Sequence, residues 1–215
     1  MDDLILIGGG GHCASVIDSV MALGAWNLVG VVDSVLQVGT SVLGVPVVGD
    51  DEALAKLRDS GVCHAAITVG STGDCGTRVR LAALAQKAGF LLPCIVDGTA
   101  TVSRFADISD GAWIGKHAIV NARSRVGFCS IVNTGSVVEH DATVGEFAHV
   151  SVGAVLCGGS SVGAGGHVGP GAIVVQGVRV GEHAVVGAGG VVLTDVPNHT
   201  RVAGIPAREM GGRGT

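Results

Sequence analysis

The sequence of 215 residues contains no tyrosine and few other aromatic residues, and charged residues make up only 14% of it. The net charge of −5 comes without any cluster of Lys or Arg, so nucleic acid and anionic membrane surfaces are not expected partners. No apolar run has the length of a membrane span, and the charged start at Asp2-Asp3 lacks the form of a signal peptide. These absences predict a cytoplasmic protein without membrane insertion.

Paired cysteines are absent too, because none of the six cysteines forms a C-x-x-C motif. They are scattered along the whole chain, at Cys13, Cys63, Cys75, Cys94, Cys129 and Cys157. This spacing predicts reduced thiols rather than disulfides or a cysteine metal site.

The sequence does contain an uninterrupted repeat. Every sixth residue from Val102 to Val192 is Val, Ile or Leu, and only Leu156 among them is not β-branched. A small residue, usually Ala, Ser or Gly, follows four places later in most repeats. A period of six fits neither a helix nor alternating strands and turns, and it indicates a solenoid.

Three hexads would make one triangular coil of eighteen residues, with the branched residue inside and the small residue at the corner. Coils stacked about 4.8 Å apart would give a prism roughly 25 Å tall over sixteen hexads. Such a regular prism predicts a left-handed parallel β-helix over residues 98–215, including a short C-terminal tail, as an exception to right-handed crossovers.

Residues 1–97 follow a different pattern, in which short apolar runs alternate with helical periodicity. We expect strands at 4–7, 28–32 and 65–69, and helices after the glycines at 8–11 and over 51–58 and 77–88. Alternating strands and helices predict a small α/β, Rossmann-like domain with a parallel sheet.

A glycine-rich loop follows the first expected strand. Gly9, Gly11 and Ala14 satisfy G-x-G-x-x-[G/A], and Asp33 closes the second strand about twenty residues later. Backbone N–H groups here could approach a phosphate at the helix N-terminus, and His12 could touch a phosphate or sugar. The domain is short for a dinucleotide, so we expect a pyrophosphate-linked ligand in one half-site; the alternative is a glycine turn needed only for packing.

The densest polar interruption of the repeat is Glu139-His140-Asp141. A histidine with a near-neutral pKa can accept a proton from a nucleophile, and a carboxylate on its other nitrogen would fix the tautomer. Adjacent strand residues point to opposite faces, so Asp141 reaches the ring only at a turn. Whether Asp141, Glu139 or a neighbouring subunit orients His140 stays open.

Two further features of the repeat suggest ligand sites. His149 and His167 are eighteen apart and would stack, but no third ligand is evident, so a metal is not expected. The residues at the third position of the hexads also form columns when they are sorted at a spacing of eighteen. One column is uncharged after its first member, and such a surface could accept a long cofactor arm. Its members are Lys116, Thr134, Val152, Pro170 and Ala188.

Taken together, the G-G-G-G-H loop, the hexads, the stretches 133–141 and 145–151 and the tail Gly204-Ile205-Pro206-Ala207-Arg208 resemble one family. The chain is similar to the nucleotide-sugar N-acetyltransferases of the sialic-acid O-acetyltransferase-like hexapeptide-repeat family. The resemblance covers almost the whole chain. It implies homotrimers with acetyl-CoA between neighbouring prisms, acting in lipopolysaccharide O-antigen biosynthesis.

The resemblance also assigns roles to individual residues. It implies that His140 accepts the proton and Asp141 raises its basicity, although several relatives have Glu at that acidic position. It places His149 at the acetyl-CoA thioester and Pro170 and Ala188 along the cofactor. It places the nucleotide-sugar site at Gly9, Gly10, Gly11, Asp33, Ser34 and Gly70, to which the position of His12 directly after the glycines adds that residue.

The implied reaction is acetyl transfer from acetyl-CoA to the 4-amino group of a nucleotide-linked 4-amino-4,6-dideoxy sugar, either GDP-perosamine or a UDP-linked sugar. The amine would attack the thioester directly; an acetyl-cysteine at Cys157 would lack a neighbouring base. The first alternative is O-acetylation of a sialic acid or similar hydroxyl, which the phosphate loop disfavours. A non-enzymatic or metal-dependent β-helix is a more distant one.

Overall fold

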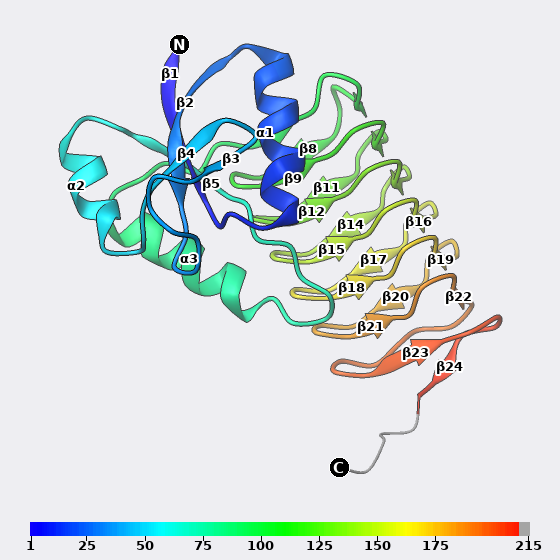
Figure 1. Cartoon of the computed structure of the whole chain (residues 1–215). Coiled ribbons are helices and arrows are strands. Elements are labelled where there is room, and N and C mark those ends of the chain that lie inside the picture. Colours follow the sequence, from blue (N-terminus) through cyan, green and yellow to red (C-terminus); the bar gives the residue numbers. More distant parts are fainter. Residues whose placement is uncertain (211–215) are drawn as a thin grey trace.

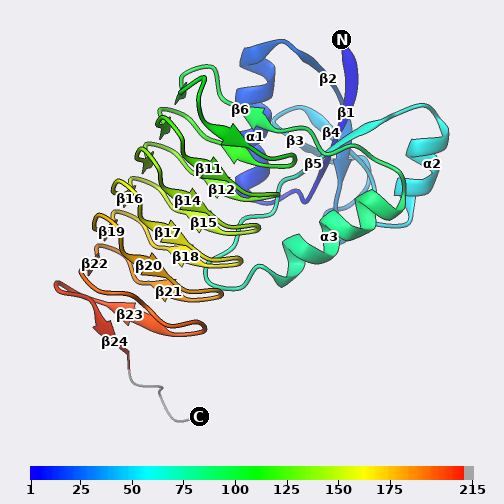
Figure 2. The same cartoon turned by 180° about the vertical axis from the view of Figure 1, so that it is seen from behind.

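The computed structural model describes residues 1–210, which form an α/β domain packed against the side of a β-helical prism (Figures 1 and 2). No helix in this part of the chain is long and apolar enough to cross a membrane. All six cysteines lie in it as free thiols.

The N-terminal domain is built on a sheet in the order β3-β4-β2-β1-β5, parallel except for β3. Its strands are β1 (Asp2–Ile7), β2 (Trp26–Val32), β3 (Ser41–Val42), β4 (Val45–Gly49) and β5 (His64–Ile67). Its helices are α1 (Gly11–Leu23), α2 (Ala53–Asp59) and α3 (Gly76–Lys87). The expected helices and strands are confirmed with ends shifted by up to two residues, whereas the β3–β4 hairpin was not predicted.

The prism has three flat faces, each a stack of short parallel strands. Face 1 contains β6 (Ile95–Val96), β9 (Trp113–Ile114), β12 (Ile131–Val132), β15 (His149–Val150), β18 (His167–Val168), β21 (Val185–Val186) and β23 (Arg201–Ala203), closed by antiparallel β24 (Arg208–Glu209). Face 2 contains β7 (Thr101–Val102), β10 (Ile119–Val120), β13 (Val137–Val138), β16 (Val155–Leu156), β19 (Ile173–Val174) and β22 (Val191–Val192). Face 3 contains β8 (Asp107–Ile108), β11 (Arg125–Val126), β14 (Thr143–Val144), β17 (Ser161–Val162) and β20 (Arg179–Val180).

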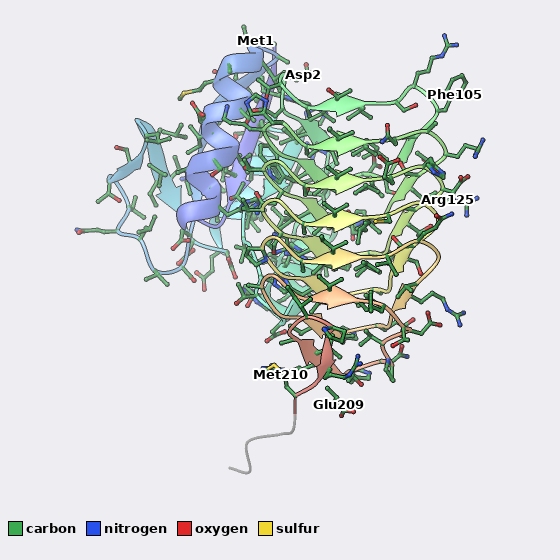
Figure 3. The ribbon with its side chains drawn as sticks, turned by 90° about the vertical axis from the view of Figure 1, so that its right-hand side faces the viewer. Met1, Asp2, Phe105, Arg125, Glu209 and Met210 are labelled. Carbon is green, nitrogen blue, oxygen red and sulfur yellow. The ribbon has the colours of Figure 1, made fainter. Side chains whose placement is uncertain are left out.

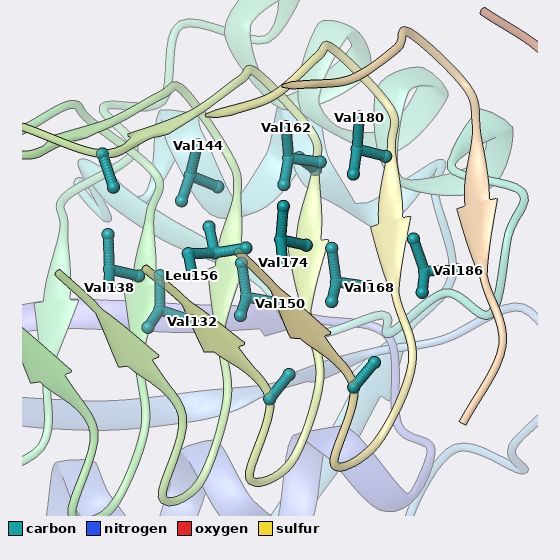
Figure 4. Packing of buried hydrophobic residues seen from close by; sticks show 14 of the residues in the cluster. Val132, Val138, Val144, Val150, Leu156, Val162, Val168, Val174, Val180 and Val186 are labelled. Atoms are coloured by element: carbon teal, nitrogen blue, oxygen red, sulfur yellow. The ribbon is translucent and has the colours of Figure 1, made fainter. Parts of the chain in front are cut away.

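The register of these stacks confirms the eighteen-residue coil. Val120 pairs with Val138, and Val138 pairs with Leu156 one coil further on. The hexad residues point inward and form one continuous cluster, in which Leu156 is fully buried (Figure 4). A single coil could not bury this surface, so stacking supplies the stability of the prism.

The corners between faces form three edges, which we number. The first edge joins faces 1 and 2 and includes residues 133–136, the second joins faces 2 and 3 and includes 139–142, and the third joins faces 3 and 1 and includes 145–148. The N-terminal domain covers face 1, where Trp113 and Ile131 pack with Val16 of α1. Helix α3 packs beside the third edge, in a cluster with Cys129.

Candidate active site

The glycine loop lies between β1 and α1, and Asp33 fixes its shape. The Asp33 carboxylate accepts hydrogen bonds from the N–H groups of Gly9 at 2.6 Å, Val35 at 2.8 Å and Leu36 at 2.9 Å. Burial acts to raise the pKa of Asp33, but these three bonds outweigh it and hold the pKa below its usual value. Asp33 therefore holds the loop from within the chain.

The loop opens onto an interdomain cavity of about 430 Å³. The N-terminal domain and the first edge both line it, with Gly11, His12, Ser15, Gly70, Ser71, Thr72, Asn133, Thr134, His149 and Val152. No side chain caps the N-terminus of α1, where Gly10 is the N-cap. The free N–H groups at this end favour an anion. Asp33 and Ser34 instead line a separate, smaller cavity of about 190 Å³, which shares no lining residue with the first.

His12 forms part of the cavity wall. Its ring packs edge-on against Trp113, with 5.9 Å between centroids, and its Nε2 has no hydrogen-bond partner within residues 1–210. Burial, and then the charge of Arg78, lower the pKa of His12 to about 4, so the ring is neutral at pH 7. His12 therefore lines the cavity with other atoms of its side chain, whereas Nε2 is buried and lies away from the open space.

His149 is buried, and both of its ring nitrogens are occupied. Nδ1 lies 2.7 Å from the carbonyl oxygen of Ser71, and Nε2 lies 3.1 Å from the side-chain nitrogen of Asn133. Because a carbonyl only accepts, Nδ1 carries the proton, and Nε2 accepts from the amide. Burial lowers the pKa of His149 to about 3, so the ring is neutral at pH 7 and links the two domains through hydrogen bonds. Its contact to the thioester stays a prediction.

Arg78 is hydrogen-bonded to a residue of the cavity wall, Ser71. It donates to the hydroxyl of Ser71 at 2.9 Å and to the carbonyl of Phe147. It thereby links α3, the loop after β5 and the third edge. Sequence reasoning missed Arg78, because an isolated arginine in a helix carries no motif.

His140 and Asp141 lie on the second edge and form the expected pair. His140 Nδ1 is 2.7 Å from Asp141 Oδ2, and the side chains are 56% and 41% exposed. The contact between sequence neighbours depends on the left-handed backbone of Asp141, whose φ is 62°. Glu139 instead accepts a bond from the His140 N–H at 3.1 Å. Asp141 is therefore the carboxylate that contacts the ring.

Two neighbours of this pair were not predicted. Arg123, eighteen residues earlier, donates to both carboxylate oxygens of Asp141. Gly158, eighteen residues after His140, lies against the ring, since a Cβ atom there would be 2.7 Å from Nε2. The eighteen-residue column was the feature that could have identified both.

Pro170 and Ala188 occupy the first edge, in the coils above Thr134 and Val152. Backbone bonds from Gly171 to Val152 and from Gly189 to Pro170 hold this column together. Gly70 lies next to His12, and a Cβ atom on it would be 3.7 Å from the His12 Cβ. The first edge thus continues the cavity wall towards the C-terminal coils.

A metal centre finds no support in the described residues. Within residues 1–210 no three His, Cys, Asp or Glu side chains are grouped so as to hold an ion. His149 and His167 do stack, with 5.1 Å between ring centroids. Burial lowers the pKa of both rings, and the pair belongs to the covered face of the prism.

Within a single chain, the residues that line the interdomain cavity and the His140–Asp141 pair lie apart. The cavity belongs to face 1 and the first edge, whereas His140 lies on the second edge, opposite face 1. Phe105, which shares the second edge, projects away from the N-terminal domain in Figure 3.

Comparisons with known proteins agree with this architecture. A model of the PglD N-terminal domain matches residues 3–83. A variant of GDP-perosamine N-acetyltransferase from Caulobacter crescentus, solved with CoA and GDP-perosamine, is 37% identical, with 98% of both chains covered and a TM-score of 0.93. The acetyltransferase domain of PglB from Neisseria gonorrhoeae, solved with acetyl coenzyme A, is 34% identical, with 97% of this chain and 98% of that one covered and a TM-score of 0.90. Comparison with curated protein sequences gives no significant match.

The fold and these matches define the class of protein: an acyltransferase built on a β-helix. Similarity extends over both domains at more than 30% identity. The chain belongs to the nucleotide-sugar N-acetyltransferase family.

Proposed function

We propose that the chain transfers acetyl from acetyl-CoA to the 4-amino group of a nucleotide-linked 4-amino-4,6-dideoxy sugar, with GDP-perosamine as the first candidate. The observation that carries this proposal is the exposed His140–Asp141 pair on a prism that resembles a GDP-perosamine N-acetyltransferase over its whole length. The glycine loop at the cavity suits the diphosphate of such a substrate.

The His140–Asp141 geometry supports general base catalysis. An ionised Asp141 only accepts, so the proton of a neutral His140 lies on Nδ1 and Nε2 is free to take the proton of the attacking amine. Gly158 lies beside Nε2, and its N–H makes no hydrogen bond within residues 1–210. That N–H is suited to stabilising the thioester oxyanion.

A homotrimer would complete the site. The outward residues of face 2 are largely apolar: Ile119, Val137, Val155, Ile173 and Val191. Those of face 3 are polar: Asp107, Arg125, Thr143, Ser161 and Arg179. An exposed apolar face indicates an interface, and a threefold axis along face 2 would set the second edge of each chain against the first edge of the next.

This arrangement would bring His140 of one chain to the cavity of its neighbour. Acetyl-CoA would then lie between Gly158 on one side and the column of Pro170 and Ala188 on the other. We infer a cytoplasmic location from these substrates. The parallel strand order of the N-terminal sheet supports a Rossmann-like domain, and the left-handed winding of the prism is part of the same proposal.

The experiment that tests the function is a thiol-release assay with acetyl-CoA and a panel of acceptors. We expect turnover with a GDP- or UDP-linked 4-amino sugar and none with the matched 4-hydroxy sugar. Acetylation of sialic acid but of no nucleotide-linked amine would favour O-acetylation instead. Absence of any acetyl-CoA binding by calorimetry would contradict both.

A further inference from the structure

The Asp141 carboxylate is shared between two cationic or potentially cationic side chains. Arg123 Nε lies 2.6 Å from Oδ1, and Arg123 Nη2 lies 2.8 Å from Oδ2. The same Oδ2 accepts the bond from His140 Nδ1 at 2.7 Å. Both Arg123 and Asp141 adopt left-handed backbone conformations, with φ of 62° at each residue.

This two-point contact restrains the carboxylate in a way that a single bond could not. The planar guanidinium matches both carboxylate oxygens and fixes their plane. That plane directs Oδ2 towards His140. Without it, only the single bond from His140 Nδ1 would restrain this 41% exposed carboxylate.

The charge of Arg123 acts in the opposite sense to that of Asp141. An adjacent anion stabilises the imidazolium, whereas an adjacent cation destabilises it. Of the neighbouring residues, Glu139 accepts a bond from the His140 backbone N–H rather than from the ring, and the uncharged Gly158 lies against the ring. Arg123 is thus the cation paired directly with the carboxylate that touches the ring.

We propose that Arg123 is a positioning residue for the acetyl transfer inferred above: its two N–H groups aim Asp141 at His140, and its charge limits how strongly Asp141 raises the basicity of the imidazole. The proposal rests on the proposed function, because it assigns Arg123 to the same reaction. A base that is too strong would retain the proton it takes from the amine, so this limit favours release after each turnover.

Two substitutions separate orientation from charge. Arg123→Met removes both the positive charge and the two-point contact with Asp141. Arg123→Lys keeps the positive charge but loses the two-point contact. Arg125→Met is the matched control, because Arg125 lies on β11 in the same coil and makes no ion pair within residues 1–210. The measurements are an NMR titration of the His140 ring and the pH profile of kcat.

In Arg123→Met we expect the His140 ring to titrate at a higher pH than in the wild type, since an opposing cation is removed. Arg123→Lys should leave that titration midpoint near the wild-type value. Both variants should lower kcat about tenfold through loss of orientation, with the KM for acetyl-CoA unchanged. Arg125→Met should alter neither quantity.

An unchanged His140 pKa in Arg123→Met would overturn the charge role, and wild-type kcat in Arg123→Lys would overturn the orienting role. Equal pKa shifts in Arg123→Met and Arg125→Met would reduce the effect to general surface charge and overturn the proposal. The NMR titration of His140 needs no substrate. If the wild-type chain were inactive on every amine tested, the proposed function would be refuted, and the titration would still test the effect of Arg123 on His140.

Discussion

At the scale of single residues, the second edge carries one ring nitrogen, Nε2 of His140, that has no hydrogen-bond partner within residues 1–210. His140 binds Asp141 through Nδ1, which leaves Nε2 facing outward beside Gly158. Arg123, and then the bond from His140, hold the pKa of Asp141 below its usual range, so the carboxylate is ionised throughout the working pH range. The pair can therefore accept a proton without Asp141 losing its charge.

Replacing the ring should affect chemistry and leave cofactor binding intact. We expect His140→Ala to lower kcat by about 10²–10⁴-fold, the usual contribution of a general base. Because the ring lies on an exposed corner, acetyl-CoA affinity by calorimetry should change little. His183→Ala, at an exposed histidine on the third edge, is a suitable control, and full activity of His140→Ala would eliminate the base role.

At the scale of elements, the hexads determined the prism almost completely. The period of six identified the inward residues, and the register confirms them from Val120 to Val192. The winding sense stays a prediction. The β3–β4 hairpin was missed because Ser41-Val42 is too short to show a strand pattern.

The candidate site was predicted less completely, for a physical reason. His140 and Asp141 were identifiable as a polar interruption of an apolar repeat, but their contact depends on a positive φ that the sequence does not reveal. Arg78 and His149 instead bond to carbonyl oxygens of the other domain, those of Phe147 and Ser71. Such contacts follow only from the packing of the two domains.

The interior of the prism should respond to deletion of single side chains. Leu156 is fully buried in the inner column. We expect Leu156→Ala to lower the free energy of unfolding by about 2–5 kcal/mol, because stacked coils cannot collapse into the cavity. Chemical denaturation would measure this loss, and Leu193→Ala, at a 52% exposed leucine, should change it by less than about 0.5 kcal/mol.

A polar clamp joins α1 to the prism at Asp97. This buried carboxylate accepts bonds from Ser19 of α1, from Thr99 and from Lys116, which also pairs with Asp18 at 3.1 Å. Burial acts to raise the pKa of Asp97, but the hydrogen bonds outweigh it and hold the pKa well below its usual range. The clamp therefore favours the folded chain while Asp97 is ionised.

The clamp makes stability depend on pH in a defined direction. A native pKa below the unfolded value of about 4 gives stability that is present above that pH and lost as the pH falls below it. We expect Asp97→Asn to lower the free energy of unfolding at pH 7 by about 2 kcal/mol and to reduce its loss on acidification. Urea unfolding at pH 7 and pH 3 would show this. An effect no larger than that of exposed Asp59→Asn would contradict the clamp.

At the scale of the whole molecule, the apolar face 2 should hold three chains together. Val155 points outward near the middle of this face. We expect Val155→Glu to convert the trimer into folded monomers, because each interface would bury an unpaired charge, and to abolish turnover. Sedimentation equilibrium would measure the mass. Thr143→Glu, on polar face 3, is the control and should leave the mass unchanged. A monomeric wild-type protein would contradict the trimer.

The most direct test of the account asks whether His140 serves the cavity of its neighbour. His140→Ala removes the base, and Gly11→Glu places a carboxylate at the phosphate end of α1, where a Cβ atom meets nothing within 4 Å. Each variant alone should be inactive. Unfolded together and refolded as mixed trimers, they should regain about a quarter of wild-type activity, because one site in four would pair an intact histidine with an intact neighbouring cavity. Mixed trimers that stay as inactive as the separate variants would contradict a site shared between chains.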